Sequence, residues 1–309
     1  MSFMAILLAL LLEQARPMAR GGAVRGLVHS WARWVARSFD AGRQQHATLA
    51  WGVVVLLPAV AVLAVQSLLW WFTGWPLVVV WNVAVLYVTL GFRQFSHHFT
   101  GIRDALEQGD EEKARALLAQ WRQTEATALP RSEIVRQVIE YSVIAAHRHV
   151  FGVLAWYSLL AAIGLGPAGA VLYRLSEFVP RYWARPDVTA LQPVSAALQG
   201  TALRMWHLVD WVPARITAIG FAVVGSFEEA IDSWRRHDRG GLADSDGVIL
   251  SSTAGAINLR VGPGLGPDGQ TGGAEPEVGH LRTVVGLVWR TVLMWMILLA
   301  LLTLARLLG

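Results

Sequence analysis

An uncharged stretch of 49 residues constrains the fold of this chain more than any other feature. It lies between Arg43 and Arg93 and contains no aspartate, glutamate, lysine or arginine. A helix that packs on a soluble core carries polar side chains along its solvent face, whereas a membrane-spanning helix needs about 20 apolar residues in succession. The stretch is long enough for two spans, and the Gly-Trp-Pro sequence that starts at Gly74 breaks it. We therefore predict a transmembrane hairpin of residues 48–72 and 77–92.

Four more apolar segments are candidates for helices in a membrane. Residues 3–12 are expected to form a retained first helix, residues 150–173 either a broken helix or a re-entrant hairpin, and residues 283–305 the last span. Residues 201–226 contain ionisable side chains, which in a membrane tend to face a protein interior or a water-filled cavity. The pattern predicts an all-α, polytopic integral membrane protein with about four or five transmembrane helices and with cytoplasmic amphipathic helices, in a single membrane domain of residues 1–309.

The composition supports this class and excludes several kinds of site. Hydrophobic residues make up 54% of the chain and charged residues 16%, against about 25% charged residues in a typical soluble domain. The chain has no cysteine, which excludes disulfides, thiol catalysis and cysteine-ligated metals. Its net charge of +4 comes from arginines that are scattered along the chain. We therefore expect the lipid bilayer, and no nucleic acid, as a partner.

The arginines also indicate which side of the membrane each polar segment occupies. Residues 16–45 carry six arginines against one acid, and we predict that they form a cytoplasmic flank with an amphipathic helix on the membrane surface. Residues 93–149 are predicted to be a cytoplasmic helical segment. Residues 227–281 are predicted to be a glycine-rich cytoplasmic loop. The expected location is a bacterial inner (plasma) membrane, which the chain crosses several times.

Two motifs carry candidate chemistry, and each has a structural alternative. Asp210 and Arg215 flank a proline that frees a backbone carbonyl. They form either a buried ion pair or a site in which Arg215 binds an anionic ligand. The glycine-rich segment that starts at Gly262 lacks the Lys-Ser/Thr ending of a phosphate loop, so it is either a flexible loop or a ligand cradle. Neighbouring histidines point in different directions on a helix, and we predict no metal site.

A series of short motifs, in the same order along nearly the whole chain, points to a known family. The two most specific are the segment from Pro213 to Thr217, which reads Pro-Ala-Arg-Ile-Thr, and the Ala-Gly-Ala sequence from Ala254 that leads to Arg260 and Gly262. In these segments the chain resembles the CobD/CbiB family of cobalamin-assembly membrane proteins, including its AmpE-like relatives.

The resemblance implies an ATP-dependent ligase that joins cobyric acid to aminopropanol or its phosphate, which is an adenosylcobinamide-phosphate synthase activity. It implies ATP and Mg²⁺ as cofactors, and a corrinoid and a nucleotide as ligands. It assigns no catalytic residue. We expect Arg122, Glu140, Arg215 and Arg260 to line one pocket. The residues that the resemblance implies for ligand binding are Arg122, Glu140, Asp210, Arg215, Gly255, Arg260 and Gly262.

Several acidic positions of the family pattern are occupied by other residues in this chain. The family's central Glu-Asn…Asp motif aligns with His147, Arg148 and Phe151, and a later pair of aspartates aligns with Trp206 and His207. Sites that lose carboxylates lose their usual Mg²⁺ ligands. Two functions therefore remain: a cobalamin-pathway amide synthase, which the glycine-rich segment favours, and a non-catalytic, AmpE-like signalling or modulator protein that acts through a ligand or a protein partner, which the missing acids favour.

Overall fold

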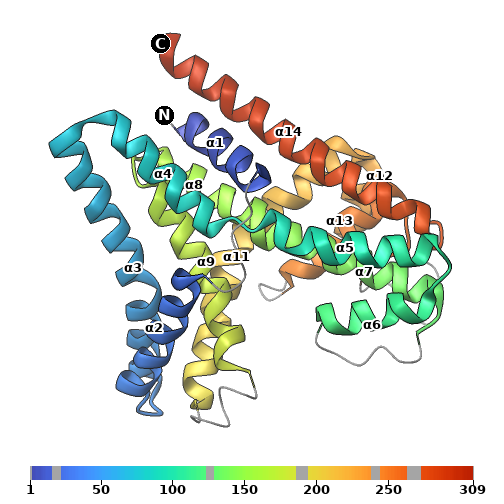
Figure 1. The fold of residues 1–309 in the computed structure, drawn as a ribbon, viewed down its shortest axis with the longest axis horizontal. Coiled ribbons are helices and arrows are strands. Elements are labelled where there is room, and N and C mark those ends of the chain that lie inside the picture. Colours follow the sequence, from blue (N-terminus) through green and yellow to red (C-terminus); the bar gives the residue numbers. More distant parts are fainter. Residues whose placement is uncertain are drawn as a thin grey trace. The chain divides into compact units, whose positions relative to one another are not determined.

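Helices form all the regular elements in the described part of the chain (Figure 1). The computed structural model describes residues 2–15, 22–122, 129–185, 194–237, 244–262 and 273–308. The chain divides into two compact units: unit 1 comprises residues 1–91 and 148–213, and unit 2 comprises residues 92–147 and 214–309. The single membrane domain stays a prediction.

Among the described residues, four helical segments are long and apolar enough to cross a bilayer, judged by length and composition. They are Gln44–Thr73, Arg131–Ala161, Ala196–Val224 and Val278–Ala305. This confirms the predicted all-α, multi-pass membrane fold. The second of these segments begins within the predicted cytoplasmic segment 93–149, because the helix that starts at Arg131 continues through a π-helical turn into the apolar residues that follow.

Unit 1 contains a hairpin of two apolar helices, as predicted. Helix α3 (Gln44–Thr73) ends at Gly74, and α4 (Trp75–Thr89) begins directly after it. Gly74 has a φ of 73°, a conformation that glycine adopts without the steric cost of a Cβ atom. The reversal therefore needs one residue, and the two helices contact each other through residues such as Gln66 and Asn82.

Polar side chains connect this hairpin to the next pair of helices in unit 1. Helices α8 (Gly152–Ala161) and α9 (Gly166–Trp183) form the second hairpin. The Tyr157 hydroxyl donates to Asn82 Oδ1 at 2.8 Å, and Asn82 Nδ2 donates to Gln66 Oε1 at 3.0 Å. Gln66 Nε2 in turn donates to the carbonyl of Gly164, in the turn between α8 and α9, at 2.9 Å. Polar groups in apolar helices pair across helices in this way because lipid offers them no partner.

The predicted amphipathic helix forms as α2 (Ala23–Phe39), and part of its apolar face packs on protein, whereas its place on the membrane surface stays a prediction. Ala32 and Val35 are fully buried in a cluster shared with α3, α9 and α11 (Ala196–Val224). Trp31 Nε1 donates to the carbonyl of Val54 at 3.3 Å, and Trp183 Nε1 donates to the carbonyl of Ala32 at 3.2 Å. The helical period of α2 was readable from the sequence, whereas the partner of its apolar face was not.

In the described part of unit 2 there are seven helical segments, and two of them lie where a loop was predicted. The unit contains α5 (Phe92–Glu107), α6 (Glu111–Arg122), α7 (Arg131–Ala146), the second half of α11, α12 (Phe227–His237), α13 (Ser245–Ile257) and α14 (Val278–Leu308). Helices α12 and α13 replace much of the expected glycine-rich loop 227–281, so that prediction was wrong for these residues.

Gly225 and Gly255 belong to a close helix contact rather than to a loop. A Cβ atom on Gly255 would lie 2.2 Å from the carbonyl oxygen of Glu229, and one on Gly225 would lie 2.6 Å from that of Ala256. Asp244 caps α13 by accepting a hydrogen bond from the Gly247 amide at 3.1 Å. Small residues therefore let α12 and α13 approach backbone to backbone.

The hairpin of α8 and α9 depends on a similar contact, which gives a test of the fold. A Cβ atom on Gly169 would lie 2.2 Å from the backbone oxygen of Trp156, which cannot move without the helix. We expect Gly169→Ala to lower the free energy of unfolding by about 1–3 kcal/mol through overpacking, measured by thermal unfolding followed by tryptophan fluorescence. Gly52→Ala in α3 is the matched control, because no atom lies within 4 Å of its added Cβ. Equal melting temperatures for the two variants would contradict the hairpin packing.

Candidate functional site

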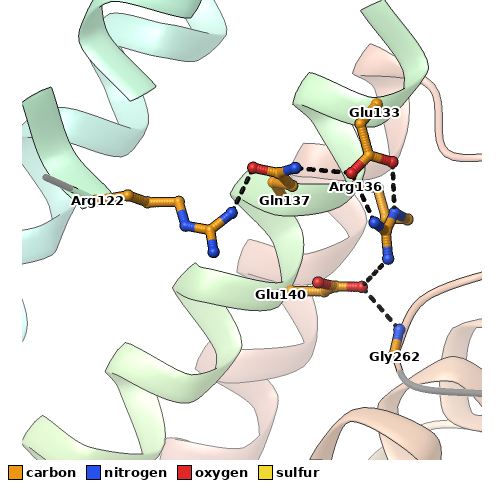
Figure 2. Close-up of polar contacts among 6 residues, drawn as sticks. All are labelled: Arg122, Glu133, Arg136, Gln137, Glu140 and Gly262. Atoms are coloured by element: carbon orange, nitrogen blue, oxygen red, sulfur yellow. Dashed lines mark hydrogen bonds and ion pairs between the residues drawn. The ribbon is translucent and has the colours of Figure 1, made fainter. Parts of the chain in front are cut away.

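A row of charged and polar side chains lies along one face of α7 (Figure 2). Arg136 donates to both oxygens of Glu133, at 2.6 and 2.7 Å, and to Glu140 Oε1 at 2.9 Å. Residues three and four positions apart are neighbours on a helix surface, so one arginine can bind the acids of the turns before and after it. These side chains are all partly exposed, so the row is open to other groups.

Glu140 connects this row to the late glycine-rich segment. Its Oε1 atom accepts a hydrogen bond from the backbone amide of Gly262 at 2.8 Å, although the two residues are 122 positions apart in the chain (Figure 2). A bond from an amide to a carboxylate is stronger than one between neutral groups. Glu140 therefore fixes the point at which the glycine-rich segment begins.

The two ends of the glycine-rich segment are also bonded to each other. Leu259 and Ala274 form an isolated β-bridge, in which the Arg260 amide donates to the carbonyl of Ala274 and the Ala274 amide donates to that of Asn258, both at 3.0 Å. Asn258 adopts the left-handed conformation with a φ of 51° and ends α13. The ten residues 263–272 lie outside the described part of the chain, so both predicted alternatives for this segment, a flexible loop and a ligand cradle, stay open.

Arg122 joins the row on α7 from the end of α6. Its guanidinium donates to Gln137 Oε1, and Gln137 Nε2 donates to Glu133 Oε1 at 2.7 Å (Figure 2). The side chains thus form one hydrogen-bonded chain that runs from Arg122 through Gln137, Glu133, Arg136 and Glu140 to Gly262.

A second set of contacts joins three segments that carry family-like motifs. His147 Nδ1 lies 2.9 Å from the hydroxyl of Thr217, and both residues are fully buried. The hydroxyl of Ser252 on α13 donates to the carbonyl of Ala218 at 2.8 Å. Within unit 2, the end of α7, the second half of α11 and α13 therefore meet. Arg215 lies on this part of α11, two positions before Thr217.

The structure places the seven predicted ligand-binding residues in different surroundings. Arg122, Glu140 and Gly262 share one hydrogen-bonded chain, and Arg260 lies at the bridge next to it. Gly255 lies at the contact between α12 and α13, where close packing leaves no space for a side chain. The shared pocket lined by Arg122, Glu140, Arg215 and Arg260 stays a prediction.

Asp210 belongs to unit 1, where the hydroxyl of Tyr173 donates to its Oδ1 atom at 2.8 Å. Asp210 is 1% exposed, and a buried carboxylate needs such donors. A Cβ atom on Gly152 would overlap the Tyr173 ring, so Gly152 provides the space that lets this tyrosine reach α11. The predicted pairing of Asp210 with Arg215 stays a prediction.

A pocket of about 460 Å³ opens in unit 2 where α7 and α14 begin. Both signs of charge occur in its wall, from Arg131 on one side and from Glu275 and Glu277 on the other. These glutamates directly follow Ala274 of the β-bridge. The pocket can therefore accommodate a small polar molecule beside the fixed ends of the glycine-rich segment.

The described residues do not fit a Mg²⁺ site, which the family resemblance would imply. Among them, no three histidine, aspartate or glutamate side chains gather as metal ligands would. The acids of the row on α7, Glu133 and Glu140, are already paired with Arg136. Mg²⁺ is usually held by carboxylates together with the phosphates of the substrate, and we assign no residue to it.

Several polar residues of the structure were missed in the sequence. Glu133, Arg136 and Gln137 carry the row on α7, and their spacing of three and four residues was the signal that could have revealed it. A π-helical turn, η1 (His147–Phe151), interrupts the helix after α7. Such turns occur frequently at functional sites, and no sequence pattern predicted this one.

Unit 1 contains a second group of charged side chains, on α9, that the sequence analysis did not identify. Glu177 is 3% exposed and accepts from Arg174 Nη1 at 3.0 Å and from Arg181. Burial alone would raise the pKa of Glu177, but Arg181 and Arg174, with smaller effects of His149 and Arg148, lower it to about 2. The carboxylate is therefore charged whenever the arginines are in place.

The hydrogen bond from the Gly262 amide to Glu140, which holds the start of the glycine-rich segment, can be tested directly. We expect Glu140→Ala to speed hydrogen exchange of the Gly262 amide at least about tenfold, because a hydrogen bond to a charged group contributes about 1.5–3 kcal/mol. Exchange resolved by mass spectrometry measures this. Glu112→Ala, on the exposed side of α6, should leave the exchange rate of the Gly262 amide unchanged. An unchanged exchange rate in Glu140→Ala would contradict the hydrogen bond between Gly262 and Glu140.

The lowered pKa of Glu177 predicts a defined pH dependence. A carboxyl whose pKa falls from 4.5 to about 2 on folding stabilises the protein fully above pH 4.5, and this contribution is lost as the pH falls toward 2. The difference in melting temperature between the wild type and Glu177→Gln should therefore be constant above pH 4.5 and shrink below it. A difference that instead shrinks between pH 7 and pH 5 would contradict the assignment.

Comparison with known proteins gives a consistent result. The profile of the family described as CobD/Cbib protein matches residues 2–282. A cobalamin biosynthesis protein CobD of Stutzerimonas stutzeri is 26% identical over 270 residues, which cover 84% of this chain and 82% of the relative. A protein of the same name from Chromobacterium violaceum is 27% identical over 61% of this chain and 57% of the relative.

No solved structure matches the chain. The family match extends over unit 1 and over unit 2 as far as residue 282, and it includes Glu140, Thr217 and Gly262, whose contacts are described above. This chain belongs to the CobD/Cbib protein family.

Proposed function

We propose that this chain acts in cobalamin biosynthesis, in a bacterial inner membrane, and forms the amide bond between cobyric acid and aminopropanol or its phosphate with ATP as the energy source. The curated relatives are named as cobalamin biosynthesis proteins. The observation that carries the proposal is the bond from the Gly262 amide to Glu140, since it holds the late family-like segment beside Arg122 on the face of α7.

The chemistry requires a carboxylate and an amine to meet while a nucleotide is bound. Arginine side chains bind phosphate through two parallel hydrogen bonds, and the exposed Arg260 at the base of the glycine-rich segment is suited to this role. The pocket beside Glu275 and Glu277 has acidic groups that can hold an ammonium group. In this proposal Arg260 and Arg122 bind anionic parts of the ligands, and Glu140 positions the segment that carries Arg260.

A second candidate is a non-catalytic, AmpE-like modulator. The observation that favours it is His147, which stands where the family pattern has a carboxylate and is fully buried against Thr217. A histidine in that position contributes no acidic ligand for a metal. A corrinoid and a nucleotide are the ligands expected for the amide synthase, and a ligand or a protein partner is expected for the modulator.

The proposal predicts a measurable reaction. The purified full-length protein in detergent, given cobyric acid, aminopropanol phosphate, ATP and Mg²⁺, should form the amide product, which chromatography and mass spectrometry detect. Loss of a residue that binds an anion in the transition state costs about 10²-fold or more in rate, so we expect Arg260→Gln to lower the rate by about that factor.

The matched control is Arg235→Gln, which removes an exposed arginine from α12 in the same unit. It should keep the wild-type rate. Absence of product from a folded wild-type protein, with or without aminopropanol in place of its phosphate, would contradict the amide synthase and leave the modulator.

A further inference from the structure

Helix α2 of unit 1 has two apolar faces, of which one is buried and the other exposed. The buried face packs on α3, α9 and α11 through side chains such as Ala32 and Val35. The exposed face is a stripe of larger apolar side chains at helical spacing, namely Val24, Leu27 and Trp34. Leu27 is 70% exposed and Trp34 is 49% exposed. Packing within unit 1 therefore explains the small residues of α2 but not this stripe.

Arginines lie directly beside the exposed stripe. Arg33 and Arg37 are four positions apart, so they are neighbours on the helix surface, and both are exposed. Arg37 is also three positions from Trp34, which makes the basic side chains and the stripe adjacent. Trp34 itself stacks on Trp31, with ring centroids 5.1 Å apart. The exposed side of α2 is therefore apolar and aromatic along one edge and basic along the next.

The neighbouring helix α3 places α2 at a boundary of the bilayer. Helix α3 is long and apolar enough to cross, and exposed tryptophans, Trp71 and Trp75, lie where it turns into α4. Tryptophan is enriched at membrane–water interfaces. At 1.5 Å per residue, Trp51 lies roughly 30 Å before Trp71 along α3, which is the thickness of a hydrocarbon core. Trp51 belongs to the same buried cluster as Ala32 of α2, so α2 packs on α3 where the second boundary falls.

The chemistry of the exposed side of α2 fits an anionic lipid surface better than a second copy of the chain. Helices that lie in the headgroup region of a bilayer combine leucine and tryptophan on one face with arginine or lysine beside it, and anionic lipids attract the basic groups. A symmetric contact between two copies would instead bring Arg33 and Arg37 of both chains together, and like charges oppose such a contact. Charge complementarity therefore selects the lipid.

From these observations we propose that Val24, Leu27 and Trp34 insert into the headgroup region of an anionic bilayer while Arg33 and Arg37 bind lipid phosphates. Helix α2 then has two partners, the core of unit 1 on one side and lipid on the other. The surface helix predicted from the sequence thereby gains a defined lipid-facing side. This surface goes beyond the proposed function, because none of its residues belongs to the row on α7, to the pocket or to the glycine-rich segment.

A spin label on the stripe reports which medium surrounds it. The chain has no cysteine, so Leu27→Cys in the full-length protein takes a nitroxide at one position. In nanodiscs that contain phosphatidylglycerol and phosphatidylcholine, the label should collide more often with oxygen, which concentrates in lipid, than with nickel ethylenediaminediacetate, which stays in water. Leu57→Cys, on an exposed position of the span α3, is the lipid reference, and Glu112→Cys, on an exposed position of α6, is the water reference.

Arginine variants test the role of charge. Nanodiscs of phosphatidylcholine alone should lower the ratio of oxygen to nickel collisions at position 27. In the Leu27→Cys background, Arg33→Gln together with Arg37→Gln should remove about half or more of this difference between the two lipids, because each arginine near an anionic surface adds to the attraction. Arg33→Lys together with Arg37→Lys keeps both charges and should retain the difference. Arg235→Gln, which removes an exposed arginine of α12, is the matched control and should retain it as well.

Three results would overturn the proposal. The first is a collision ratio at position 27 equal to that of the water reference. The second is a low collision rate with both reagents, because protein, such as a second copy of the chain, would then cover the stripe. The third is a lipid difference that is absent, or that the two glutamine substitutions leave intact. The readout is the local surroundings of α2, so failure here leaves the amide synthase untouched, and failure of that activity leaves this surface.

Discussion

Backbone hydrogen bonding in a medium without water is the constraint on which the rest of this structure depends. A chain that crosses a bilayer must satisfy its amides and carbonyls internally, and helices do so within one segment. The four long apolar helices follow from this requirement. Several of the polar contacts lie where helices begin, end or are interrupted. These places include the start of α7, the π-helical turn at His147–Phe151 and the bridge between Leu259 and Ala274.

In each unit a glutamate carboxylate holds other groups in place through charge-assisted hydrogen bonds, a backbone segment in unit 2 and two arginine side chains in unit 1. Glu140 accepts from a distant backbone amide and from Arg136, so its charge holds a segment in place. Glu177 accepts from two arginines of its own helix, so its charge orients their guanidinium groups. In each case one carboxylate positions groups that a ligand could meet. The carboxylates of Glu140 and Glu177 thus hold other protein groups in place, and the described residues fit a metal ion poorly.

Local signals in the sequence were sufficient for part of this structure. The hairpin at Gly74 was predictable because a helix-breaking glycine lies inside a long uncharged stretch. Helix α13 was missed because glycines such as Gly255 indicate a loop in isolation, and only the neighbouring helix reveals their role in packing. Likewise, Glu140 could be chosen as a candidate residue, but its partner Gly262 depends on how segments far apart in the chain come together.

The meeting of α7, α11 and α13 within unit 2 is the central claim of this account, and cross-linking tests it most directly. The chain has no cysteine, so a His147→Cys, Thr217→Cys double variant carries the only thiols, at positions whose native side chains are 2.9 Å apart. The contact predicts that a short bifunctional thiol reagent links the two positions within one chain, which mass spectrometry of the proteolysed protein detects. Linkage that is no greater than for a His147→Cys, Arg235→Cys pair, in protein that is folded and reacts with single-site thiol reagents, would contradict it.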